Sequence, residues 1–272
     1  MNRITQRLDA LRASGRKALV SYVVSGDPQP AATLPAMQAL VAKGVDIIEL
    51  GIPFSDPMAD GPVIQLGHER ALANKTTLRG TLETVKAFRE TDSDTPIVLM
   101  GYANPIERMG YKAFAEAAVE AGVDGVLTVD LPPEEATEFN AELKAVGIEN
   151  IFLIAPTTTE ERMQLIASLA SGFLYYVSLK GVTGAGHLDV SSVEEKMAKL
   201  RQITSLPVCV GFGIKDAATA KAVAQTADGV VVGSAFVSIM GELAEQGEQA
   251  IAKALGEAVA PIRAGIDEAV SA

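Results

Sequence analysis

The sequence predicts an α/β protein built as a single (β/α)8 TIM barrel over residues 1–272, with an extra helix at the N-terminus and extended loops after the second and sixth strands. Eight short runs of apolar and β-branched residues recur along the chain, separated by amphipathic stretches. The runs are apolar at both odd and even positions, which is typical of parallel strands covered on both faces. A length of 272 residues also fits one barrel, which usually takes about 250 residues.

The predicted strands follow one another along the chain, each with a helical segment behind it. The strands are residues 18–24, 45–50, 96–100, 124–129, 150–154, 173–178, 207–211 and 228–232. The clearest helical stretches are 106–121, 133–146 and 190–204. A doubly wound open sheet is the alternative fold. The Rossmann dinucleotide fingerprint is absent, however, because Gly211-Phe212-Gly213 is not followed by the third glycine.

Three joints between a helix and the next strand share a glycine. Gly44, Gly122 and Gly147 each stand where a helix should end, just before an apolar run. Glycine adopts the left-handed conformation that closes a helix without a Cβ penalty. These joints therefore predict short turns from helix to strand, as a barrel requires.

The spacing of the strands is uneven. The second and third predicted strands start 51 residues apart and the sixth and seventh 34 apart, whereas most neighbours start 20-odd residues apart. Loops that follow strands lie at the carboxyl face of a barrel, where active sites are built. The two extended loops therefore indicate where the functional site is.

Charge and cysteine content exclude several classes of protein. The net charge is −11 and the sequence pI about 4.8, which argues against a surface for nucleic acid or anionic membrane. Cys209 is the single cysteine and cannot pair within the chain, as expected in a reducing compartment. Neither a membrane-length apolar run nor a signal-peptide pattern is present. We expect a cytoplasmic protein.

Glu49 is the sharpest catalytic candidate, because it lies near the end of the second predicted strand. Side chains alternate along a strand, so Glu49 shares a face with Val45 and Ile47, turned either to the barrel interior or to the helices. An unpaired carboxylate is expensive to bury, so Glu49 is either functional or held in a strand-end salt bridge. The proline-rich loop after it adds Asp56 and Asp60, as acid–base groups or as a solvated acidic loop.

Glycine turns follow the last two predicted strands. Gly213 comes after the seventh strand, and Gly233 with Ser234 after the eighth. Barrels often bind phosphate with these two loops and a helix N-terminus, because glycines let backbone N–H groups approach the anion. The pattern favours a phosphate site over the alternative that these glycines only form turns in loops.

The segment 178–187 holds three glycines and is typical of a lid, from which Gly184 could add a donor to the phosphate site. Lys180 in this segment permits a second hypothesis, a Schiff-base lysine. No apolar pocket surrounds it in sequence to lower its pKa, so a solvated lid lysine is favoured.

The histidines, the cysteine and three tyrosines give weaker indications of function. With only His68 and His187 present, a multi-histidine metal site is unavailable. His68 stands in a helical stretch beside Glu69 and Arg70, which favours a surface or capping histidine, and Cys209 is expected to be a small core residue. Three tyrosines either line a pocket or pack with their hydroxyls bonded: Tyr22, Tyr102 and Tyr175.

Four segments resemble the tryptophan synthase alpha subunit family. They are ELGIPFSDPMADGP at 49–62, MGYANP at 100–105, GVTG at 181–184 and GFGI at 211–214. The resemblance spans essentially the whole chain and implies a lyase that cleaves indole-3-glycerol phosphate into indole and glyceraldehyde 3-phosphate by a retro-aldol reaction. It implies no metal or organic cofactor in this chain.

The resemblance also implies residue roles. Glu49 matches the catalytic acid–base group and Asp60 the second catalytic carboxylate, which stabilises positive charge at the indole nitrogen. The substrate pocket is matched by Tyr22, Met100, Tyr102, Leu127, Tyr175, Thr183 and Phe212. The phosphate positions are matched by Gly184, Gly213, Gly233 and Ser234.

A partner is implied as well. The family binds a beta subunit that carries pyridoxal phosphate, forms an α2β2 assembly and passes indole through an internal tunnel. Pro53, Asp56 and Pro132 are the expected contacts with that partner. Two other functions remain open: an aldolase that uses Lys180, and a catalytically silent activating subunit, which would have no need of both Glu49 and Asp60.

Overall fold

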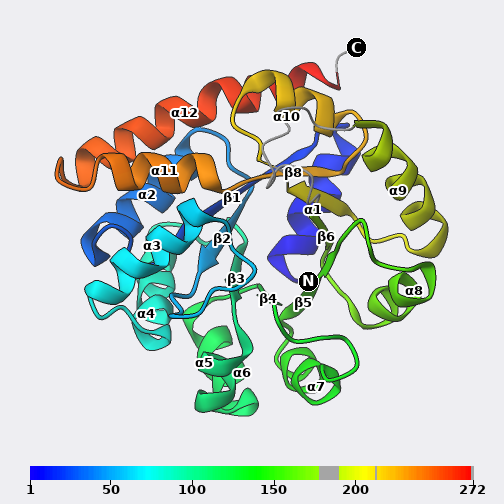
Figure 1. Cartoon of the computed structure of the whole chain (residues 1–272), viewed down its shortest axis with the longest axis horizontal. Coiled ribbons are helices and arrows are strands. Elements are labelled where there is room, and N and C mark those ends of the chain that lie inside the picture. The colour runs from blue at the N-terminus through cyan, green and yellow to red at the C-terminus, as the bar shows by residue number, and fades with distance from the viewer. Residues whose placement is uncertain (178–189, 212, 271–272) are drawn as a thin grey trace.

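Eight parallel strands close into a barrel in which each strand pairs with the next and β8 pairs with β1 (Figure 1). The computed structural model describes residues 1–177, 190–211 and 213–270. The strands are β1 (Ala18–Val24), β2 (Ile47–Gly51), β3 (Ile97–Gly101), β4 (Gly125–Thr128), β5 (Glu149–Ile154), β6 (Leu174–Val177), β7 (Val208–Gly211) and β8 (Gly229–Val232). The TIM barrel predicted from the sequence is confirmed, and each predicted strand overlaps an observed one.

Helices surround the barrel on the outside, except α1, which lies within their ring in the view of Figure 1. The described helices are α1 (Arg3–Ala13), α2 (Pro30–Ala42), α3 (Pro62–Ala73), α4 (Leu78–Arg89), α5 (Ala103–Met109), α6 (Tyr111–Ala121), α7 (Thr137–Ala145), α8 (Glu160–Leu169), α9 (Val190–Ile203), α10 (Ala217–Ala224), α11 (Ser234–Glu242) and α12 (Glu248–Glu268). The long interval after β2 holds both α3 and α4. The predicted extension after β6 lies mainly in 178–189, outside the described residues. No helix among those described is long and apolar enough to span a bilayer.

The glycine joints behave as predicted, and a fourth glycine corrects one helix. Gly44, Gly122 and Gly147 have φ of 101°, 93° and 78°, so each occupies the conformation that favours glycine. The single helix predicted over 106–121 is wrong. Gly110, with φ of 90° and ψ of 134°, divides this region into α5 and α6 because these angles cannot continue a helix.

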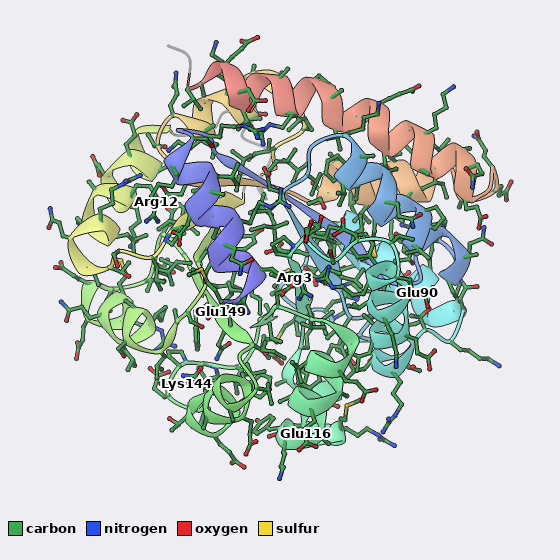
Figure 2. The ribbon with its side chains drawn as sticks, turned by 180° about the vertical axis from the view of Figure 1, so that it is seen from behind. Arg3, Arg12, Glu90, Glu116, Lys144 and Glu149 are labelled. Atoms are coloured by element: carbon green, nitrogen blue, oxygen red, sulfur yellow. The ribbon has the colours of Figure 1, made fainter. Side chains whose placement is uncertain are left out.

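Alternate residues of each strand face two separate apolar layers. Ile47 of β2 packs inside the barrel with Val20, Val98 and Leu127, whereas Ile48 packs between the barrel and the helices. Helix α1 closes the amino-terminal end of the interior, where three buried side chains join the inner cluster: Ile4, Leu8 and Leu11. Figure 2, viewed from behind, shows α1 lying across this end. The opposite, carboxyl end is therefore the one left for a site.

Aspartates tie the strands together at the closed end. Asp46, just before β2, accepts a hydrogen bond from the N–H of Leu19 at 2.9 Å, and Arg263 of α12 donates to the same carboxylate at 3.0 Å. Asp124, before β4, accepts from the N–H of Ile97 at 2.9 Å. Buried charges need such partners. These contacts secure the end of the barrel away from the carboxyl face.

Candidate active site

Glu49 points into the barrel interior, which settles the question that strand alternation left open. It lies on β2 beside Tyr22 of β1 and Val98 of β3, two residues beyond Ile47 on the same face. The side chain is 0% exposed, and neither carboxyl oxygen has a hydrogen-bond partner among the described residues. The alternative of a salt-bridged strand-end glutamate finds no partner in that part of the chain.

Burial raises the pKa of Glu49 from 4.5 to about 8. The cause is desolvation, because a carboxylate held in an apolar interior loses its hydration and the neutral form is favoured. A carboxyl group with this pKa is largely protonated at pH 7 and can both give and take a proton near that pH. The position can therefore perform general acid–base chemistry.

Asp60 is held on the loop after β2 by an aromatic side chain from the loop after β3. The hydroxyl of Tyr102 donates to Oδ2 of Asp60 at 2.8 Å and accepts from the N–H of Ala59 at 3.2 Å. The ring of Phe54 stacks on that of Tyr102 with centroids 5.2 Å apart. The Asp60 side chain is 7% exposed. The proline-rich loop after β2 is thus fixed by specific contacts around its carboxylate.

The prediction of a surface or capping role for His68 is wrong. The side chain is 2% exposed, and its Nε2 lies 3.4 Å from Oδ2 of Asp60 and 3.4 Å from the hydroxyl of Tyr22. A signal in the sequence could have found it. His68 follows Ile64 by four residues and precedes Ala71 by three, so all three share the inward face of α3.

Two further tyrosines surround Glu49 on the interior face. Tyr22 and Tyr175 have their pKa values raised well above 10, first by burial and then by the nearby carboxyl groups. Glycines make room for both rings, because a Cβ at Gly51 would lie 2.4 Å from the Tyr22 hydroxyl and one at Gly211 only 2.2 Å from that of Tyr175. Both tyrosines therefore lie on the interior face of the barrel rather than in the helix layer.

The apolar side chains of the barrel interior near Glu49 come from neighbouring strands. Met100 of β3 and Leu127 of β4 belong to the same inner cluster, and they pair in the strand register. Cys209 of β7 is fully buried in that cluster, which confirms that it is a core residue.

The glycine turns meet at neighbouring strand ends, because β7 pairs with β8. Gly213, with φ of 43°, is exposed just beyond β7. Gly233 precedes α11 and Ser234 is its first residue, so the N-terminal N–H groups of a nine-residue helix lie at the end of β8. A helix N-terminus attracts anions. The arrangement can hold a phosphate.

The other predicted positions lie on loops or outside the described residues. Asp56 and Pro132 are exposed, whereas Pro53 is buried within this chain. Four predicted residues fall outside the described residues: Lys180, Thr183, Gly184 and Phe212. Among the described residues, no group of three His, Cys, Asp or Glu side chains could hold a metal ion.

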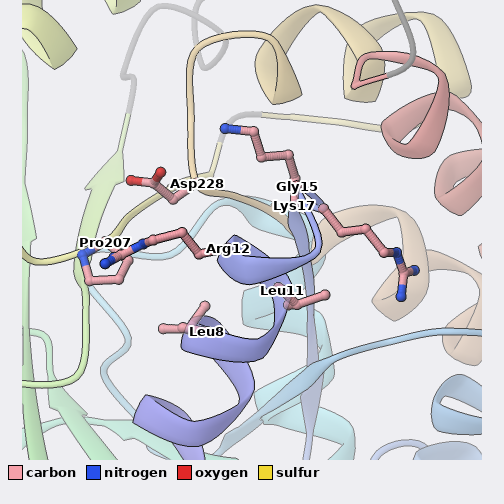
Figure 3. Close-up of a pocket in the computed structure, with 8 residues that line it drawn as sticks. Leu8, Leu11, Arg12, Gly15, Lys17, Pro207 and Asp228 are labelled. Atoms are coloured by element: carbon pink, nitrogen blue, oxygen red, sulfur yellow. The ribbon is translucent and has the colours of Figure 1, made fainter.

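A small cavity of about 100 Å³ lies at the amino-terminal end of the barrel, beside α1 (Figure 3). Its walls include Leu8 and Leu11 of α1, with Arg12, Lys17 and Asp228 around them. None of the predicted site residues lines it. The chemistry is concentrated at the other end.

Comparison with known proteins agrees with this geometry. A family model described as tryptophan synthase alpha chain matches residues 8–264. The tryptophan synthase alpha chain of Burkholderia thailandensis is 56% identical over 269 residues, which cover 99% of this chain and 98% of the relative. That of Thioalkalivibrio sulfidiphilus is 57% identical over 267 residues, 98% of this chain and 100% of the relative.

A solved structure agrees as well. The crystal structure of tryptophan synthase subunit alpha from Legionella pneumophila superposes with a TM-score of 0.92 at 45% identity, covering 98% of this chain and 99% of that one. Family match, sequence identity and fold therefore agree over nearly the full length. The chain belongs to the tryptophan synthase alpha chain family.

Proposed function

We propose that Glu49 and Asp60 are the two carboxyl groups with which this lyase carries out the alpha reaction, the cleavage of indole-3-glycerol phosphate into indole and glyceraldehyde 3-phosphate. One observation carries the proposal: Glu49 is a buried interior carboxyl group whose pKa is raised to about 8, at the same end of the barrel as a fixed Asp60. Both act at neutral pH without a cofactor in this chain.

Glu49 transfers the protons. Protonated Glu49 gives its proton to C3 of the indole ring, which makes the ring an electron-poor leaving group. The resulting carboxylate takes the proton of the hydroxyl group on the adjacent chain carbon. The bond from that carbon to C3 then breaks, its electrons return to the ring, and the carbon becomes an aldehyde. Glu49 ends the cycle protonated, so no net proton is consumed.

Asp60 supplies negative charge where positive charge develops. Protonation at C3 leaves a cationic ring with the charge at the indole nitrogen, and a carboxylate that accepts the N–H stabilises it. Tyr102 already holds Oδ2 of Asp60 at 2.8 Å. An acceptor fixed in advance need not reorganise as the charge appears, which is what lowers the barrier.

The rest of the pocket binds the substrate. The indole ring and the glycerol chain lie among Tyr22, Met100, Tyr102, Leu127, Tyr175, Thr183 and Phe212. The phosphate is held by Gly184, Gly213, Gly233 and Ser234. The support among described residues is that Gly213 and Ser234 stand at neighbouring strand ends, beside a helix N-terminus.

Replacing the proton donor tests the catalytic assignment. Glu49→Gln keeps the shape but cannot titrate, so kcat should fall at least about 100-fold while KM changes little, as is typical of lost acid–base catalysis. The matched control is Glu245→Gln, an exposed glutamate on the turn after α11, which should leave both constants unchanged. Near-normal turnover by Glu49→Gln would refute the assignment.

The two alternatives have their own tests. If the reaction ran through a Schiff base on Lys180, borohydride would trap a substrate adduct on that lysine. A silent activating subunit would show no cleavage of indole-3-glycerol phosphate by the purified chain, alone or with a beta subunit.

A valine at Gly213 or Gly233 tests the phosphate site. The branched side chain obstructs backbone approach to the anion, and at Gly213 it also strains a backbone with φ of 43°. Substrate affinity should fall more than kcat, because the phosphate is remote from the broken bond. Unchanged affinity for glycerol phosphate in both variants would move the phosphate elsewhere.

Family membership implies a beta-subunit partner, and we place its contact at the loop between β2 and α3. This assignment includes an α2β2 assembly in the cytoplasm, pyridoxal phosphate in the beta subunit, and a tunnel for indole. Asp56 is exposed on this loop and Pro132 on the loop after β4, whereas the buried Pro53 acts through the shape of the loop between β2 and α3. Met58 of the same loop is 79% exposed, as an apolar interface residue would be.

A charge at the proposed interface tests it. Met58→Glu should weaken the complex with a beta subunit about tenfold or more in analytical ultracentrifugation, because binding would bury a carboxylate. The control is Val119→Glu on α6, an apolar residue 41% exposed beside the amino-terminal end of the barrel. Equal affinities for the two variants would place the interface elsewhere.

A further inference from the structure

We propose that His68 is a positioning residue for Asp60: a neutral imidazole that directs its Nε2–H at Oδ2 of that carboxylate and so fixes the orientation in which Asp60 meets the indole nitrogen. The inference rests on the proposed role of Asp60 and extends it to a residue on a different element, since His68 lies on α3 and Asp60 on the preceding loop. His68 itself need not touch the substrate.

The hydrogen bond at the other ring nitrogen determines the tautomer. The backbone N–H of Phe54 donates to Nδ1 of His68 at 3.1 Å. A nitrogen that accepts a hydrogen bond carries no proton, so the imidazole is neutral and its proton is on Nε2. The loop that carries Asp60 thus sets the tautomer of the histidine that faces Asp60.

The proton on Nε2 is directed at two oxygens. Nε2 lies 3.4 Å from Oδ2 of Asp60 and 3.4 Å from the hydroxyl of Tyr22. The side chains of His68 and Asp60 are only 2% and 7% exposed, so little water competes for these groups. Contacts of this length are common in catalytic sites without substrate and shorten when the site is occupied.

Both donors converge on the same oxygen of Asp60. Tyr102 donates to Oδ2 at 2.8 Å, and His68 approaches that atom from α3. No described residue donates to Oδ1, so this oxygen remains for the substrate N–H. The position of Oδ2 determines the plane of the carboxylate. Two donors from separate elements restrict that position more tightly than Tyr102 does alone.

Two amide substitutions separate the functions of the two ring nitrogens. The short Asn side chain places its amide near Nδ1, so His68→Asn retains an acceptor for the Phe54 N–H and loses the donor to Asp60. The longer Gln side chain places its N–H near Nε2, so His68→Gln retains that donor and loses the acceptor. Both variants lose the imidazole ring, and they differ from each other by one methylene group.

The experiment measures cleavage of indole-3-glycerol phosphate by the full chain with a saturating beta subunit. We expect His68→Asn to lower kcat about tenfold with KM within about twofold, the effect of one hydrogen bond to a charged group. His68→Gln should stay within about threefold of the wild type. In an Asp60→Asn background, His68→Asn should change kcat less than about twofold, because its effect passes through Asp60.

A spectroscopic measurement does not depend on activity. The chain has two histidines, so long-range ¹H–¹⁵N correlation spectra of the labelled protein can be assigned with His187→Gln. His68 should be the neutral tautomer with its proton on Nε2 at pH 7.5. A proton on Nδ1, or on both nitrogens, would overturn the proposal.

The outcomes separate the two hypotheses. If Asp60→Asn turns over normally, the proposed role of Asp60 fails. If Asp60→Asn is inactive but His68→Asn matches the wild type, the role of Asp60 stands and positioning by His68 is refuted. If His68→Gln is the impaired variant and His68→Asn is active, the Phe54 contact is what matters and the proposal is also refuted.

Discussion

The buried carboxyl group of Glu49 should make the chain less stable as the pH rises. The folded state holds its proton up to a pKa of about 8, whereas the unfolded chain releases it near 4.5. Between these values the folded state binds more protons than the unfolded state, so the free energy of unfolding falls with increasing pH. Glu49→Gln is neutral throughout and should not lose this stability.

The size of the effect follows from the two pKa values. Each unit of difference corresponds to about 1.4 kcal/mol, so the wild type should lose about 2.5 kcal/mol relative to Glu49→Gln between pH 5 and 7, and about 4 kcal/mol by pH 9. Because Glu49 is 0% exposed, solvent screening does not reduce this contribution. Such a loss is a large fraction of the stability of an ordinary domain.

Urea denaturation of the isolated chain at pH 5, 6, 7, 8 and 9 measures the difference. The free energy of unfolding of Glu49→Gln minus that of the wild type should rise with pH, steeply up to about 8 and little beyond. The control Glu245→Gln removes an exposed carboxyl group and should track the wild type at every pH. A gap between Glu49→Gln and wild type that stays constant from pH 5 to 9 would show that Glu49 titrates alike in both states and would refute the reasoning.

Three further outcomes are expected. Tyr102→Phe keeps the ring that stacks on the loop but loses the hydroxyl donor to Asp60, so kcat should fall about tenfold at unchanged stability, and an unchanged kcat would contradict this. Gly211→Ala should displace Tyr175, since the added Cβ would lie 2.2 Å from its hydroxyl, and a normal KM would show that the ring can move without cost. Cys209 is fully buried and its thiol pKa is raised by burial, so a thiol reagent should react only in urea, and fast reaction in buffer would be inconsistent with the barrel interior.

Most of the fold could be predicted from the local pattern of the sequence. Strands covered on both faces, helices of 3.6 periodicity and glycines that end helices are properties of neighbouring residues, so 18–24 and the joints at Gly44, Gly122 and Gly147 could be predicted one by one. Gly110 was missed because its apolar neighbours continue the helical pattern on both sides, and only its φ of 90° reveals the break.

Tertiary structure decided which face of a strand is the interior. In a parallel barrel both faces are apolar, so alternation groups Ile47 with Glu49 but does not say whether the pair meets the barrel axis or the helices. Closure of the sheet turned Glu49 inward and removed it from water, and this burial is what raises its pKa. The chemistry of the residue was therefore a consequence of sheet curvature.

His68 is a second residue whose surroundings could not be predicted from the sequence. Its charged neighbours Glu69 and Arg70 suggest a surface position, yet a helix turn places them on other faces than His68. Whether the face of α3 that carries His68 contacts apolar core residues or a carboxylate depends on how α3 packs against β1 and on the path of the preceding loop. Sequence by itself determined the buried strands, the glycine joints and the acidic loop, because these depend on the local pattern of residues. Other contacts join separate elements that only the closed barrel brings together. These contacts place four side chains side by side: His68, Asp60, Tyr102 and Tyr22.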